Sequence, residues 1–148
     1  MAKFDGDSQK VMKLAELEAR RFNHEYIGTE HVLLALVKDD SGFTAGVLKN
    51  LGLDPHEVVA KIDATIKPGP CPVVAGRLPV TPPFKRVVEH AIENARNLKH
   101  PRVEVPHLLL GLIHDDQTVA AIVLKNSGVT LEVFRSEVLR QLDETPPA

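Results

Sequence analysis

The chain contains an internal repeat, and this repeat constrains its fold more than any other feature of the sequence. Residues 8–66 align with residues 84–142 without a gap, and the identical residues recur at helical spacing. The segment IGTEHVLLAL, residues 27–36, returns as VEVPHLLLGL at residues 103–112. Similarity of this kind indicates a duplicated supersecondary unit whose copies share one core. We therefore expect two halves of the same fold, related by a pseudo-two-fold axis.

Each copy contains four segments with the apolar periodicity of a helix. The second segment is apolar almost all round, which predicts a helix buried at the centre of its half. Gly52 and Gly128 follow the third segment, where a left-handed residue often ends a helix. Asp54, before Pro55, has the pattern of an N-cap followed by the first helical residue. The expected helices cover residues 8–22, 30–38, 44–51 and 54–66 in the first copy, and 82–98, 106–114, 119–127 and a last segment through Phe134, Val138 and Leu142 in the second.

The segment between the copies, residues 67–83, is not expected to be helical. It reads KPGPCPVVAGRLPVTPP, and proline lacks the amide donor that a helix interior needs. Thr81 and Pro82 then open the next helix as its N-cap and first residue. No segment alternates as a strand would. We expect an all-α fold of eight helices over residues 1–148, with one repeat at 8–66, a proline-rich linker at 67–83 and a second repeat at 84–142.

The composition argues against several classes of protein. A net charge of −2 is unlike that of proteins that bind the phosphate backbone of nucleic acids. The chain has neither the run of about 18 apolar residues of a membrane span nor the apolar core of a signal peptide near its start. Its single cysteine, Cys71, cannot form an internal disulfide and suits a reducing cytoplasm. We expect a cytoplasmic, monomeric domain without nucleic acid or membrane partners, with Cys71 as a bystander thiol.

Two pairs of histidines recur in the repeat. His31 and His107 open the central helices, which raises the possibility of a metal site. Zinc needs three or four converging ligands, however, and the one cysteine lies in the linker. The favoured interpretation is a pair of buried rings, each hydrogen-bonded to the neighbouring backbone. His24 and His100 end the first helices, where histidine favours the negative end of the helix dipole. We expect no metal and no cofactor.

Recurring charged residues have structural interpretations as well. Asp39–Asp40 and Asp115–Asp116 resemble the paired carboxylates of acid–base catalysis, but each pair follows a helix in a turn, where aspartate caps the next helix. Arg20 and Arg96 are interpreted as members of surface ion pairs. Without a nucleophile–base pair, a metal cluster or a phosphate-binding loop, no catalytic residue is assigned and an enzyme is not favoured.

Three successive motifs resemble those of the amino-terminal domain of Clp/Hsp100 proteins, and most closely those of the ClpC type. They are Ala15–Ala19 in the first helix, Gly28–Leu36 in the second and Val47–Gly52 in the third, and the likeness covers residues 4–142. The resemblance implies a non-catalytic docking domain that receives protein substrates or adaptor proteins for Clp unfoldase and peptidase rings. The sequence has no G-x-x-x-x-G-K-[ST] motif for a nucleotide. The chain is therefore either a domain of a larger ATPase or a free-standing accessory protein that regulates the assembly or activity of the Clp protease complex.

The resemblance also implies a ligand site. Some ClpC-type domains bind phosphorylated arginine at two equivalent sites, each through the glutamate of a G-T-E-H motif. Gly28, Thr29 and Glu30 match this motif, with Thr29 as the expected N-cap and Glu30, the first helical residue, facing the guanidinium. The alternative is that Glu30 only stabilises the helix dipole. Val105 and Pro106 replace the threonine and glutamate in the second copy, so we expect one site and not two.

Overall fold

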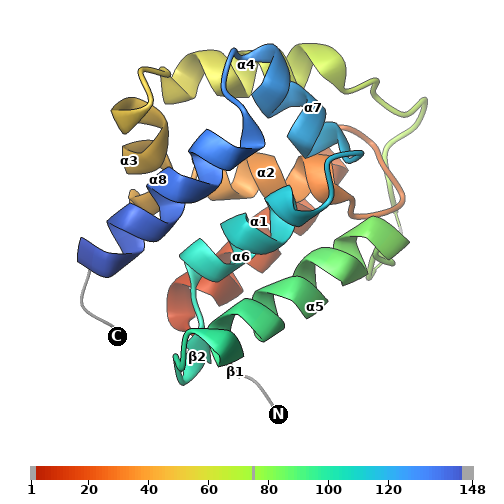
Figure 1. Cartoon of the computed structure of the whole chain (residues 1–148). Helices are drawn as coiled ribbons and strands as arrows, with labels where there is room; N and C mark the ends of the chain where they lie inside the picture. Colours follow the sequence, from red (N-terminus) through yellow and green to blue (C-terminus); the bar gives the residue numbers. More distant parts are fainter. Residues whose placement is uncertain (1–2, 75, 145–148) are drawn as a thin grey trace.

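The computed structural model describes residues 3–74 and 76–144, and its main elements are helices (Figure 1). The prediction of an all-α fold with eight helices is confirmed for this part of the chain. The predicted helix limits agree with the observed ones to within two residues. The helices are α1 (Gly6–Arg21), α2 (Thr29–Val37), α3 (Phe43–Asn50), α4 (Pro55–Thr65), α5 (Pro82–Asn97), α6 (Val105–His114), α7 (Val119–Asn126) and α8 (Leu131–Glu144).

The second helix of each copy lies at the centre of the molecule, as its all-round apolar character predicts. Nearly every residue of α2 and α6 is buried, and α2 packs along α1 as α6 packs along α5. The α5–α6 contact is unusually close at Gly111, where an added Cβ would lie 2.4 Å from the carbonyl oxygen of Val87. The equivalent residue between α1 and α2 is Ala35, so the two helix pairs are not packed identically.

The third helix of each copy packs onto the other copy. Helix α3 contacts α6 and α8, and α7 contacts α2 and α4 (Figure 1). The buried apolar residues accordingly form one cluster that draws on both halves. This exchange brings the start of α7 beside the start of α2, and the start of α3 beside the start of α6. Each of these meeting points lies between the halves.

The predicted helix ends are mostly observed. Asp54 Oδ1 accepts a hydrogen bond from the amide of His56 at 2.9 Å, and Thr81 Oγ1 accepts one from Phe84 at 3.2 Å. Both act as N-caps, as the sequence indicated. Gly52 and Gly128 have φ of 79° and 87°, the left-handed conformation in which glycine ends a helix without steric cost.

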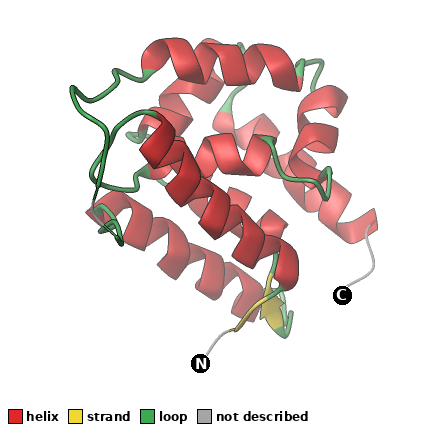
Figure 2. Cartoon of the chain, turned by 180° about the vertical axis from the view of Figure 1, so that it is seen from behind, coloured by secondary structure: helices red, strands yellow, loops and turns green. Residues whose placement is uncertain are grey.

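The expectation that the chain has no strand is wrong at its start. Strand β1 (Lys3–Phe4) pairs in parallel with β2 (Arg102–Val103), as seen at the lower edge of Figure 2. Two residues are too few to produce an alternating pattern, so these strands could not be predicted. In the linker, residues 67–74 and 76–81 form no helix, as predicted. Val80 pairs with Ile27 in an isolated bridge.

Candidate functional site

Helix α2 begins one residue earlier than the sequence indicated. Gly28 is the N-cap, with extended backbone at φ −114° and ψ −178°, and its carbonyl oxygen accepts from the amide of His31 at 3.2 Å. The prediction of Thr29 as the N-cap is therefore wrong, because Thr29 is the first helical residue and Glu30 the second. The N-cap of α6 is Glu104, so Pro106 is likewise the second helical residue and not the first.

A histidine ring fills the glutamate position of a capping box at the start of α2 and of α6. His31 Nδ1 accepts a hydrogen bond from the amide of Gly28 at 2.9 Å, and His107 Nδ1 accepts one from Glu104 at 2.8 Å. Each ring lies three residues after the N-cap, where a capping box places glutamate or glutamine. Both rings are completely buried. The interpretation of His31 and His107 as buried rings bonded to the backbone is confirmed.

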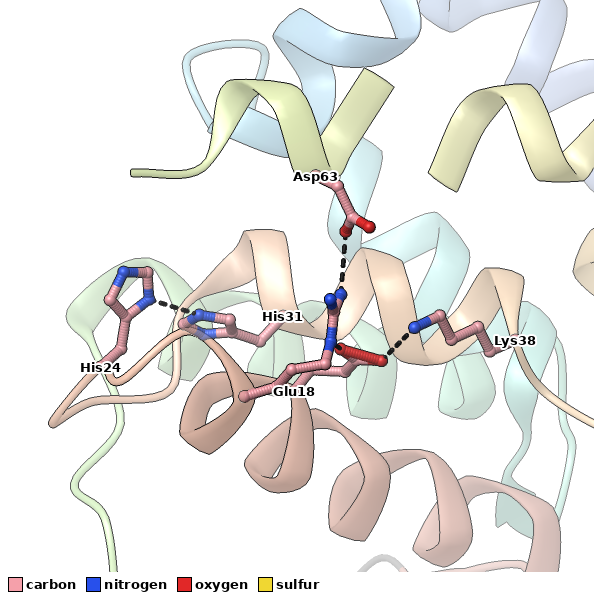
Figure 3. Close-up of polar contacts among 6 residues, drawn as sticks. Glu18, His24, His31, Lys38 and Asp63 are labelled. Carbon is pink, nitrogen blue, oxygen red and sulfur yellow. Dashed lines mark hydrogen bonds and ion pairs between the residues drawn. The ribbon is translucent and has the colours of Figure 1, made fainter. Parts of the chain in front are cut away.

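These backbone contacts fix the proton positions in the first histidine pair. Because His31 Nδ1 accepts a hydrogen bond, the neutral ring carries its own proton on Nε2. That Nε2 donates to Nδ1 of His24 at 2.8 Å (Figure 3). His24 Nε2 in turn donates to the carbonyl oxygen of Lys67 at 2.8 Å. Every ring nitrogen in this chain of bonds is thus satisfied while both histidines are neutral. Burial lowers the pKa of His31 to about 4.

The second pair repeats this arrangement and has an acid beside it. His107 Nε2 and His100 Nδ1 lie 2.8 Å apart, and burial lowers the pKa of His107 to about 4. Possible metal-ligating atoms of His100, Glu104 and His107 all lie within 4.8 Å of one another. The amide that donates to His107 Nδ1 keeps the proton on Nε2, so this atom has no lone pair for a metal ion. The geometry therefore does not favour a metal centre here.

The predicted role of His24 and His100 at the helix dipole is wrong. Helices α1 and α5 end at Arg21 and Asn97, and both histidines follow a residue in the left-handed conformation. Their backbone amides bond to carbonyl oxygens at the helix ends, at 2.9 and 2.8 Å, while their rings turn to the buried histidines. The sequence could not show this because the two rings of a pair are separated by a loop.

A buried carboxylate joins three helices next to the first histidine pair. Glu18 of α1 is 3% exposed, and it accepts hydrogen bonds from Lys38 at 2.5 Å and from Arg21 at 2.7 Å (Figure 3). Arg21 also donates to Asp63 of α4 at 2.9 Å. Burial alone would raise the pKa of Glu18, but the hydrogen bonds from Lys38 and Arg21 bring it below its ordinary value. Lys38 and Arg21 thus hold Glu18 as an ionised carboxylate.

The three predicted site residues lie together in a pocket of about 280 Å³. Gly28, Thr29 and Glu30 form one wall of it. Sequence reasoning missed the other walls, because nothing in a repeat shows which helix of the other copy packs against this turn. They consist of Tyr26 from the preceding loop, Thr81 and Pro83 at the start of α5, and Gln117, Thr118 and Val119 at the start of α7. We call this cavity the Glu30 pocket.

Glu30 is folded back over its own N-cap. A Cβ at Gly28 would lie 1.9 Å from Glu30 Oε1, so only glycine accommodates this position of the carboxylate. Oε1 is buried and has no hydrogen-bond donor among the described residues. His31 Nδ1 is 3.5 Å away, but it already accepts from Gly28 and cannot donate. Burial raises the pKa of Glu30, against smaller lowering effects from His24 and from a hydrogen bond with its own backbone amide.

The Glu30 pocket also receives the amino-terminal ends of three helices. The starts of α2, α5 and α7 all contribute to its walls. Each such end carries a partial positive charge. At α5 no free amide of the first turn accompanies this charge, because Pro82 and Pro83 have no N–H and the amide of Phe84 donates to Thr81 Oγ1. No lysine or arginine is among the described lining residues. The pocket therefore combines a carboxylate that lacks a donor with helix ends that favour an anion.

The equivalent pocket of the second copy has a different chemistry. It has a volume of about 270 Å³ and is formed by the starts of α1, α3 and α6. Three carboxylates line it, those of Asp5, Asp7 and Glu104, and Asp5 already accepts from the amide of Ser8 at 2.8 Å. Pro106 replaces the glutamate. The protein's own acids thus supply the negative charge that the helix ends favour.

The remaining candidates behave as structural residues. Asp115 Oδ1 accepts from the amide of Gln117 at 2.9 Å in the turn after α6, and Asp39 accepts from the hydroxyl of Ser41 after α2. The expectation that these aspartates cap the next helix is wrong, because the N-caps of α3 and α7 are Gly42 and Thr118. Arg20 forms a half-exposed ion pair with Glu16 at 3.6 Å, as predicted. Cys71 is a free, exposed thiol. None of the described helices is long and apolar enough to cross a membrane by itself.

Comparison with known families identifies the domain. The sequence model of the Clp repeat (R) N-terminal domain matches residues 3–98 and 80–148. The chain belongs to this family. As a Clp repeat domain it is 40% identical over 143 residues to the ATP-dependent Clp protease ATP-binding subunit ClpA homolog of Guillardia theta, a match that covers 97% of this chain. It is 38% identical over 146 residues to the chloroplastic chaperone protein ClpC2 of Oryza sativa subsp. japonica, covering 99% of this chain.

These Clp relatives are much longer proteins. The chain spans 17% of the Guillardia subunit and 16% of the Oryza chaperone. The fold also matches the crystal structure of the Hsp104 N-terminal domain from Candida albicans, with a TM-score of 0.84 at 14% identity, covering 97% of this chain and 93% of that one. The same arrangement of helices therefore occurs in a domain whose sequence is mostly different.

Proposed function

We propose that this Clp repeat domain is a non-catalytic docking module that delivers protein substrates or adaptor proteins to Clp unfoldase and peptidase rings. Its family and its long relatives, named as ATP-binding subunits and chaperones of Clp proteases, support this role. We further propose that it acts as a monomer in the cytoplasm, where an exposed free thiol such as Cys71 stays reduced.

The proposed ligand of the Glu30 pocket is phosphorylated arginine on a substrate protein. The observation that carries this proposal is the buried Oε1 of Glu30, which has no donor among the described residues. A guanidinium group offers paired N–H donors to such a carboxylate. The ends of α2, α5 and α7 supply the favourable potential for the phosphoryl group. Proline at position 106 leaves the second pocket without this carboxylate.

Calorimetric titration with free phosphoarginine tests the ligand. The expected result is one site per chain, with binding abolished in Glu30→Ala and strongly weakened in Glu30→Gln, which keeps the shape of the side chain but removes its charge. Glu104→Gln in the second pocket is the matched control and should leave the affinity unchanged. Two sites per chain, or binding that persists in Glu30→Ala, would refute the proposal.

A second measurement tests docking of whole proteins. An unfolded protein carrying phosphorylated arginines should bind the domain in fluorescence anisotropy, and the same protein after dephosphorylation should bind at least tenfold more weakly, equivalent to about 1.4 kcal/mol. Free phosphoarginine should displace it. Equal binding of the two forms would show that the pocket does not recognise phosphorylated arginine.

A further inference from the structure

One face of α1 differs from the equivalent face of α5 in a way that the fold does not require. Leu14 is half-buried and Leu17 is 61% exposed, whereas their counterparts in the repeat are His90 and Glu93. Helix α5 packs onto α6 with these polar residues, so packing does not demand leucine at the two positions. Exposed leucines at positions where the duplicated fold accepts polar residues point to an interaction surface.

A hollow of about 340 Å³ lies next to Leu14. It is lined by Lys10, Val11 and Leu14 of α1, and by Lys38, Asp39 and Asp40 at the end of α2. The second copy covers the corresponding place with its own side chains. There the rings of His90 and His114 stack with centroids 3.6 Å apart, at positions equivalent to Leu14 and Lys38.

The first copy leaves this place open because Lys38 turns away from it. Its ammonium group points to the buried carboxylate of Glu18, as Figure 3 shows. The counterpart of Glu18 is Asn94, whose amide bonds to the carbonyl oxygen of His90 at 2.8 Å. With no carboxylate at position 94, His114 has no equivalent partner, and its ring lies against His90. The hollow is thus a consequence of the Glu18–Lys38 ion pair.

The rim of the hollow on α1 is basic. Lys10 and Lys13 are exposed, and neither forms an ion pair with any residue that the structure describes. Positions 10, 13, 14 and 17 lie on one side of a helix, and none of them is acidic. We call Lys10, Lys13, Leu14 and Leu17 the α1 face. It presents two lysines without ion-pair partners among the described residues beside two leucines. The α1 side of the hollow thus complements an acidic amphipathic segment, while Asp39 and Asp40 line the side at the end of α2.

We propose that the α1 face and the adjoining hollow dock an acidic amphipathic helix of a partner protein. A leucine-like side chain of the partner enters the hollow beside Leu14, and carboxylates one helical turn away pair with Lys10 and Lys13. Helix-in-groove recognition places its anchors at such spacings. This surface is separate from the Glu30 pocket, and the inference does not depend on the binding of phosphoarginine.

The test uses two synthetic peptides of one design. Each has leucines at i, i+3 and i+7, flanked by glutamates in the first peptide and by lysines in the second. Titrated into the ¹⁵N-labelled domain, the glutamate peptide should shift the amide resonances of residues 10–17 and 38–41. The lysine peptide should bind at least tenfold more weakly, a difference of about 1.4 kcal/mol. Equal binding of the two peptides, or shifts confined to other surfaces, would overturn the proposal.

The repeat supplies variants that preserve the fold. The double variant Leu14→His/Leu17→Glu introduces the residues that α5 carries, so it should unfold at nearly the same temperature and lose at least tenfold in affinity for the glutamate peptide. Lys10→Glu/Lys13→Glu should reverse the preference between the peptides. Val133→Glu, at an exposed valine of α8, and Glu30→Ala should leave the affinity for the glutamate peptide and the preference between the peptides unchanged.

Two outcomes with these variants would refute the proposal. The first is unchanged binding of the glutamate peptide to Leu14→His/Leu17→Glu. The second is concentration-dependent self-association in analytical ultracentrifugation that this double variant abolishes, since the occupant would then be a second copy of the chain. A loss of peptide binding in Glu30→Ala would likewise show that the peptide occupies the Glu30 pocket instead.

Discussion

At the scale of single residues, the candidate site depends on a matched pair. Glu30 can fold over the start of α2 only because Gly28 has no side chain. Both positions differ in the second copy, where Glu104 and Pro106 stand. The resemblance of Gly28–Glu30 to a known motif made these residues predictable. Their reciprocal fit was not, because it depends on a side-chain rotamer that no sequence pattern encodes.

Gly28→Ala should displace the side chain of Glu30 with little effect on the stability of the domain. The φ of −114° suits alanine, and the added methyl meets only the mobile end of the Glu30 side chain, so the free energy of unfolding should change by less than about 0.5 kcal/mol. The displaced carboxylate should lower the affinity for phosphoarginine. Thermal unfolding and calorimetry of the same sample check both parts, with Gly6→Ala, whose methyl meets no atom within 4 Å, as the control.

Glu18→Gln tests the buried carboxylate of α1. The change leaves the ammonium of Lys38 and the guanidinium of Arg21 facing a neutral amide, and should destabilise the domain by roughly 1–3 kcal/mol at pH 7. Urea unfolding measures this. Glu16→Gln, in the half-exposed pair with Arg20, should cost no more than about 0.5 kcal/mol, and equal costs for the two variants would contradict the argument. Because the pKa of Glu18 is lowered, its contribution is present above the ordinary pKa of glutamate and is lost on acidification.

At the scale of elements, the helices were predictable and their starts less so. Apolar periodicity and well-placed glycine and proline located all eight helices. The starts of α2 and α6 were misplaced by one residue because the rings of His31 and His107 cap them, a role usually filled by hydroxyls and acids. The exchange of α3 and α7 between the halves left no periodic signal, so the residues that complete the Glu30 pocket could not be found.

Gly111→Ala tests the close contact of α5 and α6. The added methyl would lie 2.4 Å from the backbone oxygen of Val87, which cannot rotate away as a side chain would. The helices must separate, at a cost of roughly 1–3 kcal/mol in unfolding free energy. The control is Gly46→Ala in α3, where the methyl meets only the flexible side chain of Gln141. A change of similar size in both variants would show that the α5–α6 distance is not set at Gly111.

At the scale of the whole molecule, the two buried histidines couple stability to pH. Their pKa is about 4 in the folded protein, against an ordinary value of 6.5. The unfolded chain therefore binds more protons between these values, and stability is lost as the pH falls from about 6.5 towards 4. Each histidine contributes on the order of 2–3 kcal/mol to this loss. The raised pKa of Glu30 has the opposite effect, because it favours the folded state as the pH falls. Only one carboxyl group acts in this way, whereas two imidazoles act against it.

Urea unfolding at pH 7.0, 5.5 and 4.5 measures this dependence. The slope of the unfolding free energy against pH should correspond to the uptake of nearly two protons at pH 5.5, falling towards one in His31→Gln. His56→Gln, at an exposed position in α4, should keep the wild-type slope. Stability that stays constant from pH 7.0 to 4.5 would show that the histidine pairs accept protons without breaking their hydrogen bonds.

The exchange of third helices also bears on how the two pockets came to differ. A single repeat on its own would leave uncovered the surface on which the other copy's third helix packs. In a symmetric dimer of single repeats the two pockets between the subunits would be identical, and every substitution would appear twice. Two copies within one polypeptide are free of that constraint, so one pocket carries Glu30 while the other carries Pro106 and carboxylates of its own.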